Sequence, residues 1–419
     1  MMSEKEGFSE FKYGWPIVGS SAMGIGLGMS PLPFYTIGVF IAPLMTEFGW
    51  SVGQILGALG FFSFAALFTS PLIGYATDRL GVRKMVIISI ITFSLSFMAF
   101  SLNNGSKTLY IFLWIALALF GSGTLPITWT KVINRWFIKK RGLALGLSLL
   151  GTGLFGVLAK NLAFYIIENH GWRTAYIGLA LLPLLISLPL AIMFFRDIND
   201  PKVADKVNKL KEELPYYKES KSVMLVGSTI REALSDYKFW LLALSFIPIS
   251  FAIGGPIPNL EKILDVKGFN AGDAVKIASV VGVAVIFGRL IGGYLIDKLW
   301  APGVSFVLFL IPVISCYIFR MPELSYGMAI LAIAVLGFAA GVEFDVMAFL
   351  VSKYFGLKNY SAIYGTLYGF FAIGAGFGPG LFGSSYTSTG SYDSIFGYAA
   401  IAFVLGAMPL LFMGKYRYD

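Results

Sequence analysis

Long apolar runs alternate with short polar connections over almost the whole chain. A helix crosses the hydrocarbon core of a bilayer with about 20 apolar residues. Prolines such as Pro31, Pro33, Pro256 and Pro258 interrupt some of the runs, and such breaks are tolerated where neighbouring helices or a water-filled cavity satisfy the freed backbone groups. The pattern predicts an all-α integral membrane protein with twelve spans, at residues 15–43, 53–76, 85–103, 108–133, 142–166, 174–195, 238–260, 274–296, 303–320, 325–352, 361–386 and 392–414.

The composition excludes the soluble classes of protein. Apolar residues (AVILMFWYC) make up 57% of the chain and charged residues 13%, whereas soluble domains carry about 25% charged residues. With one cysteine, Cys316, and one histidine, His170, the chain offers no internal disulfide and no histidine-cluster metal site. The sequence contains no nucleophile–base pair and no phosphate-binding glycine loop between a strand and a helix. We therefore expect neither an enzyme nor a bound cofactor.

Basic residues gather in alternate connections, and this sets the expected orientation. One set holds residues 79–84, 135–141, most of 197–237 and the C-terminal tail, whereas the opposite set is poorer in Lys and Arg. Because cytoplasmic connections carry the excess of these residues, we expect both termini in the cytoplasm and the protein in the plasma (inner) membrane. Topology explains the net charge of +9, so a nucleic-acid partner is not expected.

A polar segment at 197–237 divides the chain into two halves. We expect residues 1–196 to form an N-terminal bundle of six helices and residues 238–419 a C-terminal bundle of six, joined by a cytoplasmic linker loop. Near the end of this linker, Thr229 is followed three residues later by Glu232. This spacing indicates a capping box that opens a short amphipathic helix before the seventh span.

The two halves are related by an internal repeat. The sequence GYATDR at 74–79 has a weaker copy, GYLIDK, at 293–298, and the same separation carries Trp136 to Phe355 and Gly146 to Gly365. One register over several stretches indicates duplication of a six-span unit with both copies in the same orientation. Parallel repeats that meet around a central site are a recurring architecture of transporters.

The loop between the second and third spans carries the most specific motif. Residues 74–84 (GYATDRLGVRK) match the pattern G-x-x-x-D-[RK]-x-G-x-[RK]-[RK]. With twelve spans and the second copy, the chain resembles the major facilitator superfamily over its whole length. The resemblance implies two pseudo-symmetric six-helix bundles that work by alternating access. It also implies a conformational latch, with a plain basic loop as the alternative, formed by Gly74, Asp78, Arg79, Gly81, Arg83 and Asp297.

Further segments resemble one branch of that superfamily. NRWF at 134–137, KRGLALG at 140–146 and GWR at 171–173 are similar to the monocarboxylate and oxalate–formate carriers. The fifth span lacks the Gly-Pro pair of drug/proton antiporters. The glycine-rich segment at 376–380 favours tight helix packing.

Three ionisable residues fall at one depth of the second half. A charge at the centre of a span raises the free energy of insertion by about 2.5–3.5 kcal/mol, so each of the three is expected to have either an oppositely charged partner or a functional role. Arg289 lies in the eighth span, in a segment similar to that in which the related carriers bind the substrate carboxylate. Glu343 and Asp345 lie in the tenth span, roughly 200° apart on the helix. One of them can pair with Arg289 while the other faces the cavity and carries a proton; a static ion pair is the alternative for all three.

Other polar residues are weaker candidates. The spans that line the cavity in this superfamily carry Tyr35, Thr128, Tyr364 and Tyr368, which we add to Arg289 as candidate substrate-binding residues. Lys160 lies near the outer end of the fifth span, where we expect its side chain to reach the interface rather than bind an anion.

These features predict a monomeric secondary transporter in the lipid bilayer that moves a small organic anion, a monocarboxylate, together with protons. Two alternatives remain open. A carrier for a cationic or zwitterionic solute would use Glu343 and Asp345 as binding groups, and a non-transporting membrane sensor would bind its ligand without moving it.

Overall fold

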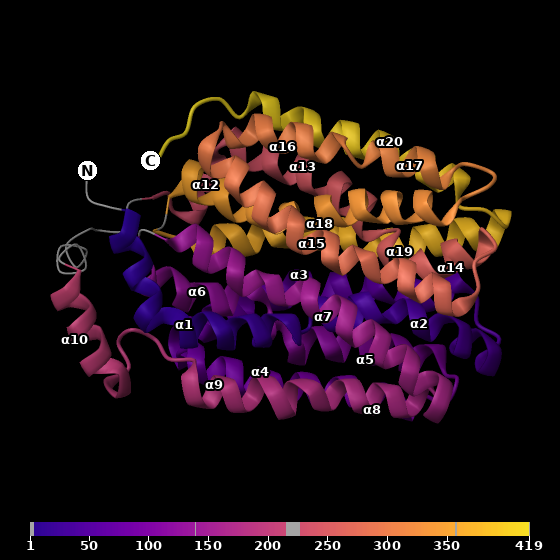
Figure 1. The fold of residues 1–419 in the computed structure, drawn as a ribbon, viewed down its shortest axis with the longest axis horizontal. Helices are drawn as coiled ribbons and strands as arrows, with labels where there is room; N and C mark the ends of the chain where they lie inside the picture. The colour runs from indigo at the N-terminus through magenta and orange to yellow at the C-terminus, as the bar shows by residue number, and fades with distance from the viewer. Residues whose placement is uncertain (1–3, 139, 215–226, 357, 419) are drawn as a thin grey trace.

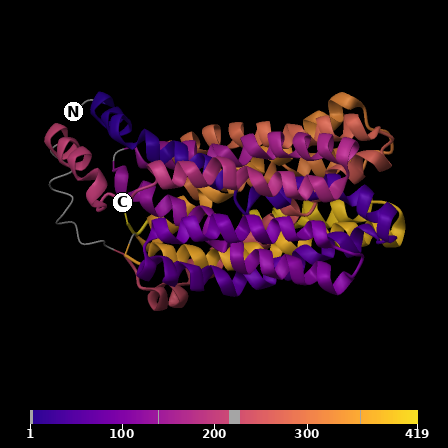
Figure 2. The ribbon, with the colours of Figure 1, turned by 90° about the horizontal axis from the view of Figure 1, so that it is seen from below.

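The computed structural model describes residues 4–138, 140–214, 227–356 and 358–418, except for the side chains of residues 4–8, 71, 74, 75, 78, 79, 134, 141, 142 and 361. This part of the chain is almost entirely helical, and its one β-pairing is an isolated bridge between Gly227 and Gly356. Helices of the first half lie along one side of the molecule and those of the second half along the other (Figure 1). Both termini lie at one end, which we call the proximal end; the opposite end is the distal end (Figures 1 and 2).

The helices follow the expected order. The first half contains α1 (Glu4–Gly26), α2 (Pro31–Phe48), α3 (Val52–Leu80), α4 (Val82–Met98), α5 (Lys107–Gly121), α6 (Pro126–Trp136), α7 (Arg141–His170), α8 (Trp172–Leu182) and α9 (Leu188–Phe194). The connection contains α10 (Ala204–Glu213) and α12 (Ile230–Ser235). The second half contains α13 (Tyr237–Gly254), α14 (Leu260–Val266), α15 (Ala271–Lys298), α16 (Ala301–Leu310), α17 (Val313–Phe319), α18 (Tyr326–Phe355), α19 (Tyr360–Thr389) and α20 (Asp393–Ala407).

Eleven segments of the described chain are long and apolar enough to cross a membrane. They correspond to eleven of the twelve expected spans, and the first is longer than expected, running over Ser9–Phe48. The twelfth expected span, 361–386, forms the long helix α19, which is not among the eleven. The all-α membrane fold is therefore confirmed, whereas apolarity alone does not give the count of twelve.

The first span of each half is broken where a Pro-x-Pro sequence occurs. In the first half, α1 ends before Pro31, and the backbone N–H of Met29 in the break donates to Thr124 Oγ1 (2.9 Å). In the second half, α13 gives way to a short 3₁₀ turn and then α14. There the amide of Asn259 donates to the carbonyl oxygens of Gly255 (2.8 Å) and Pro379 (3.1 Å). Side chains thus bond backbone groups within and beside both breaks, and breaks at membrane depth require such partners.

The two halves pack along glycine-lined contacts between α3 and α19 and between α7 and α15. A Cβ atom added to Gly380 of α19 would lie 2.9 Å from Gly57 Cα of α3, and one added to Gly282 of α15 would lie 2.5 Å from the carbonyl oxygen of Gly153 in α7. These positions have no room for a side chain, and small residues permit this close approach of helices. The close packing expected for the 376–380 segment is confirmed.

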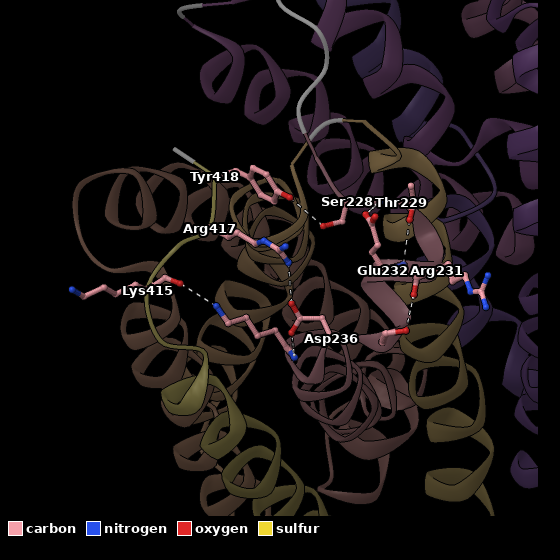
Figure 3. A network of polar contacts seen from close by, with 10 residues as sticks. Ser228, Thr229, Arg231, Glu232, Asp236, Lys415, Arg417 and Tyr418 are labelled. Carbon is pink, nitrogen blue, oxygen red and sulfur yellow. Dashed lines mark hydrogen bonds and ion pairs between the residues drawn. The ribbon is translucent and has the colours of Figure 1, made fainter.

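The end of the linker is fixed to the C-terminal tail at the proximal end (Figure 3). The expected capping box is confirmed, since Thr229 N–H donates to Glu232 and Glu232 N–H donates to Thr229 Oγ1. Beside it, the hydroxyl groups of Ser228 and Tyr418 lie 3.3 Å apart, and Arg417 Nη1 lies 3.5 Å from Asp236 Oδ2. The linker therefore enters the second half through a bonded junction.

Candidate functional site

A cavity lies between the two halves, at the level of the helix breaks. Its volume is about 90 Å³. Its wall includes Ser30 and Pro31 from the first break and Ile257 from the second, together with residues of α3, α5, α7, α15, α18 and α19. Much of the wall is aromatic and apolar, with contributions from Phe34, Phe62, Trp114, Phe344 and Phe371. A largely apolar pocket with a few converging polar groups is the usual form of a small-molecule site.

Arg289 is the one cation in the described wall of this cavity. Its side chain, on α15, is 2% exposed. Nη1 donates to Asp345 Oδ1 on α18 (2.9 Å), and Nη2 donates to Thr152 Oγ1 on α7 (3.2 Å). The Nε atom is buried and has no hydrogen-bond partner within the described residues. The guanidinium therefore bridges the two halves, and its Nε–H group can donate to a further acceptor.

The two carboxyl groups of α18 take different positions. Asp345 pairs with Arg289, and its side chain is 11% exposed. Glu343 is buried in the cavity wall, and its Oε1 atom has no hydrogen-bond partner among the described residues. This is the arrangement that their separation of about 200° on a helix allows: one carboxyl group faces the arginine and the other the cavity.

The weaker polar candidates divide into two groups. Tyr35 and Tyr368 line the cavity. Thr128 on α6 and Tyr364 on α19 are buried, but the described wall does not include them. Sequence reasoning missed Thr152, whose hydroxyl group contacts Arg289 from the other half. Nothing in the local sequence of α7 distinguishes this threonine, because its role depends on the packing of α7 against α15.

The motif loop lies at the proximal end and is described only in part. The side chains of Asp78 and Arg79, and the surroundings of Gly74, fall outside what the structure describes. Gly81 joins α3 to α4 with φ of 87°, a conformation that favours glycine. Arg83 Nη2 donates to the carbonyl oxygen of Ile192 (2.6 Å), which ties the loop to α9 within the first half. Asp297, in the second copy of the motif, is exposed near the end of α15.

Lys160 does not reach the membrane interface, so that expectation is wrong. Its side chain is fully buried, and Nζ lies 2.7 Å from Glu261 Oε1. Glu261 belongs to α14, which follows the second helix break and is brought against α2 and α7. Glu261, which replaces water as the partner of the Lys160 charge, comes from the other half of the chain. The residue spacing within the fifth span therefore could not predict this contact.

The comparisons with known proteins agree with this architecture. The family model described as Major Facilitator Superfamily matches residues 23–356. The chain is 24% identical to the cis,cis-muconate transport protein of Acinetobacter baylyi over 387 residues, which cover 90% of this chain and 89% of the relative. It is 23% identical to human monocarboxylate transporter 14, covering 90% of this chain and 86% of the relative. A quinolone resistance transporter of Acinetobacter baumannii is 28% identical over 58% of this chain and 56% of its own length.

The family model matches most of the chain, and this match agrees with the helical fold, the membrane-crossing segments and the central cavity. The relatives are named as transporters rather than enzymes. The protein belongs to the Major Facilitator Superfamily and is a multi-pass membrane transporter.

Proposed function

We propose that the protein carries a small organic anion, a monocarboxylate, together with a proton by alternating access. The observation that carries this proposal is Arg289, a buried cation in the cavity wall that holds partners from both halves. A guanidinium offers a planar fork of donors that matches a carboxylate, and it stays charged throughout a transport cycle. A single cation in the described part of the wall favours one carboxylate on the substrate.

Substrate binding exchanges one set of partners for another. The incoming carboxylate takes donors from Nε and Nη2 of Arg289, and Thr152 is released from its bond. Because Thr152 lies on α7 and Arg289 on α15, this exchange alters a contact between the halves. Tyr35 and Tyr368 serve as further substrate contacts, and the aromatic wall favours an acid with an apolar or unsaturated chain over a sugar acid.

Proton coupling is assigned to the carboxyl groups of α18. An ionised carboxylate buried without a hydrogen-bond partner is costly, and Glu343 is buried with one oxygen unbonded. A proton on Glu343 removes that cost while the site is closed, and release follows when the cavity opens to water. Asp345 instead holds Arg289 in place while the substrate is absent.

In the proposed transport cycle, the two halves of the chain move relative to each other. Residues 1–196 and 238–419 act as the two rocking units, joined by the loop at 197–237. The 74–84 loop, with Asp78, Arg79 and Arg83, and Asp297 in the second half control closure at the proximal end. On the distribution of basic residues, this end lies in the cytoplasm and the protein in the plasma (inner) membrane.

Uptake in proteoliposomes tests the proposal. Radiolabelled short-chain and unsaturated monocarboxylates are offered with and without an inward proton gradient. We expect accumulation that depends on the gradient and is abolished by Arg289→Ala. Arg231→Ala, which alters an exposed arginine on α12, is the matched control. Uptake that survives Arg289→Ala would refute the carboxylate site.

A second candidate function is carriage of a cationic or zwitterionic solute. It is favoured by one observation, the unbonded oxygen of Glu343 in the cavity wall, and by the partial similarity to a quinolone resistance transporter. Labelled amines in the same assay, with Glu343→Gln as the variant, distinguish it from the first. Saturable uptake of an amine lost in Glu343→Gln, with no uptake of carboxylates, would establish this alternative.

A further inference from the structure

A second buried ion pair joins the two halves, away from the cavity. Lys160 Nζ on α7 lies 2.7 Å from Glu261 Oε1 on α14. The Lys160 side chain is fully buried and that of Glu261 is 10% exposed. Neither residue belongs to the described wall of the cavity. The pair therefore requires an explanation other than contact with the substrate.

The pair belongs to the distal seam between the halves. On α7, Lys160 lies two helical turns beyond Thr152, which is about 12 Å further from the Arg289 contact. Next to it, the amide of Asn161 donates to Ser279 Oγ on α15 (2.9 Å), again between halves. Gly38 of α2 packs directly against the Glu261 carboxyl group, where any Cβ atom would collide. Helices α2, α7, α14 and α15 thus enclose the two charges.

A buried ion pair discriminates between conformations more than it stabilises a protein. The cost of taking two charges out of water is comparable to their mutual attraction in the interior. The intact pair therefore adds little net free energy to the closed seam relative to an open seam in which both charges are hydrated. When one charge is removed, the other is left buried without a partner only while the seam is closed. Loss of one partner must favour the open seam, and loss of both must not.

We propose that Lys160 and Glu261 form an interdomain lock at the distal end, closed while the cavity faces the proximal side and open while it faces the distal side. The proposal rests on the alternating-access cycle proposed above, but not on the identity of the substrate. In this role the two residues position the halves and do not bind the cargo. The two residues of the lock are energetically coupled. A variant that lacks one of them should open the seam, whereas a variant that lacks both should not.

Cysteine labelling tests the lock, because the chain has a single cysteine. Cys316 is buried, and Cys316→Ser gives a background into which Ser30→Cys places a thiol on the cavity wall. A membrane-impermeant maleimide is applied to the distal face of oriented vesicles without substrate. We expect Lys160→Met and Glu261→Gln each to raise the labelling rate at least about tenfold. The neutral double variant Lys160→Met/Glu261→Gln and the reversed pair Lys160→Glu/Glu261→Lys should stay within about threefold of the parent, as coupled residues do in a double-mutant cycle.

A distal ion pair within one half provides the control. Glu47 and Arg173 both belong to the first half, so Glu47→Gln should leave the labelling rate unchanged. Unchanged labelling in both single lock variants would overturn the proposal, as would an increase in the double variant equal to that in the singles.

If the single variants are not recovered folded in gel filtration, the neutral double variant and the reversed pair decide. Folded protein with parental labelling in both supports the lock, and misfolding or altered labelling of either overturns it. Labelling requires no substrate, so failure to transport a monocarboxylate would not affect the result.

Discussion

Arg289 Nη1 donates to Asp345 Oδ1 over 2.9 Å, and this bond joins α15 to α18 in the part of the second half that faces the cavity. The arginine is thereby oriented before any substrate arrives. Its Nη2 atom donates to Thr152 of the other half, and its Nε atom has no partner among the described residues. A carboxylate that enters this site meets a cation whose geometry is already set, which reduces the entropy lost on binding.

Replacing Asp345 with Asn should make the empty carrier less stable and its response to anions larger. The change leaves the buried guanidinium without its counter-charge, and breaking a buried pair costs about 3–5 kcal/mol. A bound carboxylate restores that charge. We expect a lower melting temperature without ligand and a larger rise with a monocarboxylate than in the parent. Asp205→Asn, at an exposed position on α10, is the control. An unchanged anion response would show that a bound carboxylate does not replace the counter-charge that Asp345 provides to Arg289.

Replacing Glu343 with Gln should uncouple transport from protons. Glutamine resembles the protonated carboxyl group in shape but takes up no proton. We expect accumulation driven by a pH gradient to vanish, while counterflow between equal substrate pools remains within about threefold of the parent, a change of less than about 1 kcal/mol. Glu323→Gln, on an exposed turn, should leave both activities intact. Persistent gradient-driven accumulation in Glu343→Gln would place the proton site elsewhere.

Replacing Gly380 with Val should obstruct closure of the distal end. A Cβ atom at this position would lie 2.9 Å from Gly57 Cα, a backbone atom that has no side-chain freedom to move away. Overpacking of this kind costs about 1–3 kcal/mol, so we expect the transport rate to fall about tenfold or more. Gly365→Val on the same helix meets nothing within 4 Å and is the matched control. Equal rates in the two variants would show that α3 and α19 do not need to approach this closely.

Deleting residues 414–419 should destabilise the proximal end. The tail accepts a bond from Tyr354 at the Gly414 carbonyl oxygen (2.7 Å) and donates the N–H of Tyr418 to the carbonyl oxygen of Lys353 (2.9 Å). It also bonds to the linker junction (Figure 3). At about 1 kcal/mol for each hydrogen bond, we expect a loss of about 2–4 kcal/mol, measured by thermal unfolding in detergent. Lys415→Ala, which retains the backbone of the tail, should unfold like the parent.

Much of the fold could be predicted from the sequence, because membrane insertion depends on properties of each segment taken alone. The apolar runs gave eleven of the twelve expected spans, and Thr229 with Glu232 gave the cap of α12, since a capping box needs only residues three apart. The family could be recognised because the 74–84 loop is a local motif. The boundaries of the two bundles, the orientation in the membrane and the roles of the site residues stay predictions.

The candidate site was less accessible to sequence reasoning, because it consists of contacts between distant segments. Arg289, Glu343 and Asp345 were identified because charges are rare at membrane depth. Thr152 carries no such signal, and its contact with Arg289 exists only through the packing of α7 on α15. Lys160 was placed wrongly for the same reason, since its partner Glu261 lies beyond a break in another span.

The modest apolarity of α19 has a consequence for how the protein is made. This helix is rich in glycine and in tyrosine, serine and threonine, and most of its length packs against α3 and α13 rather than facing outward. Insertion of a single segment into the bilayer depends on its own apolarity, and the described part of α19 is not among the eleven segments apolar enough to cross a membrane by themselves. Its assembly must therefore draw on helices synthesised earlier. Substitutions on α3 that weaken its packing against α19 should lower the yield of membrane-integrated protein, even where they leave the cavity unchanged.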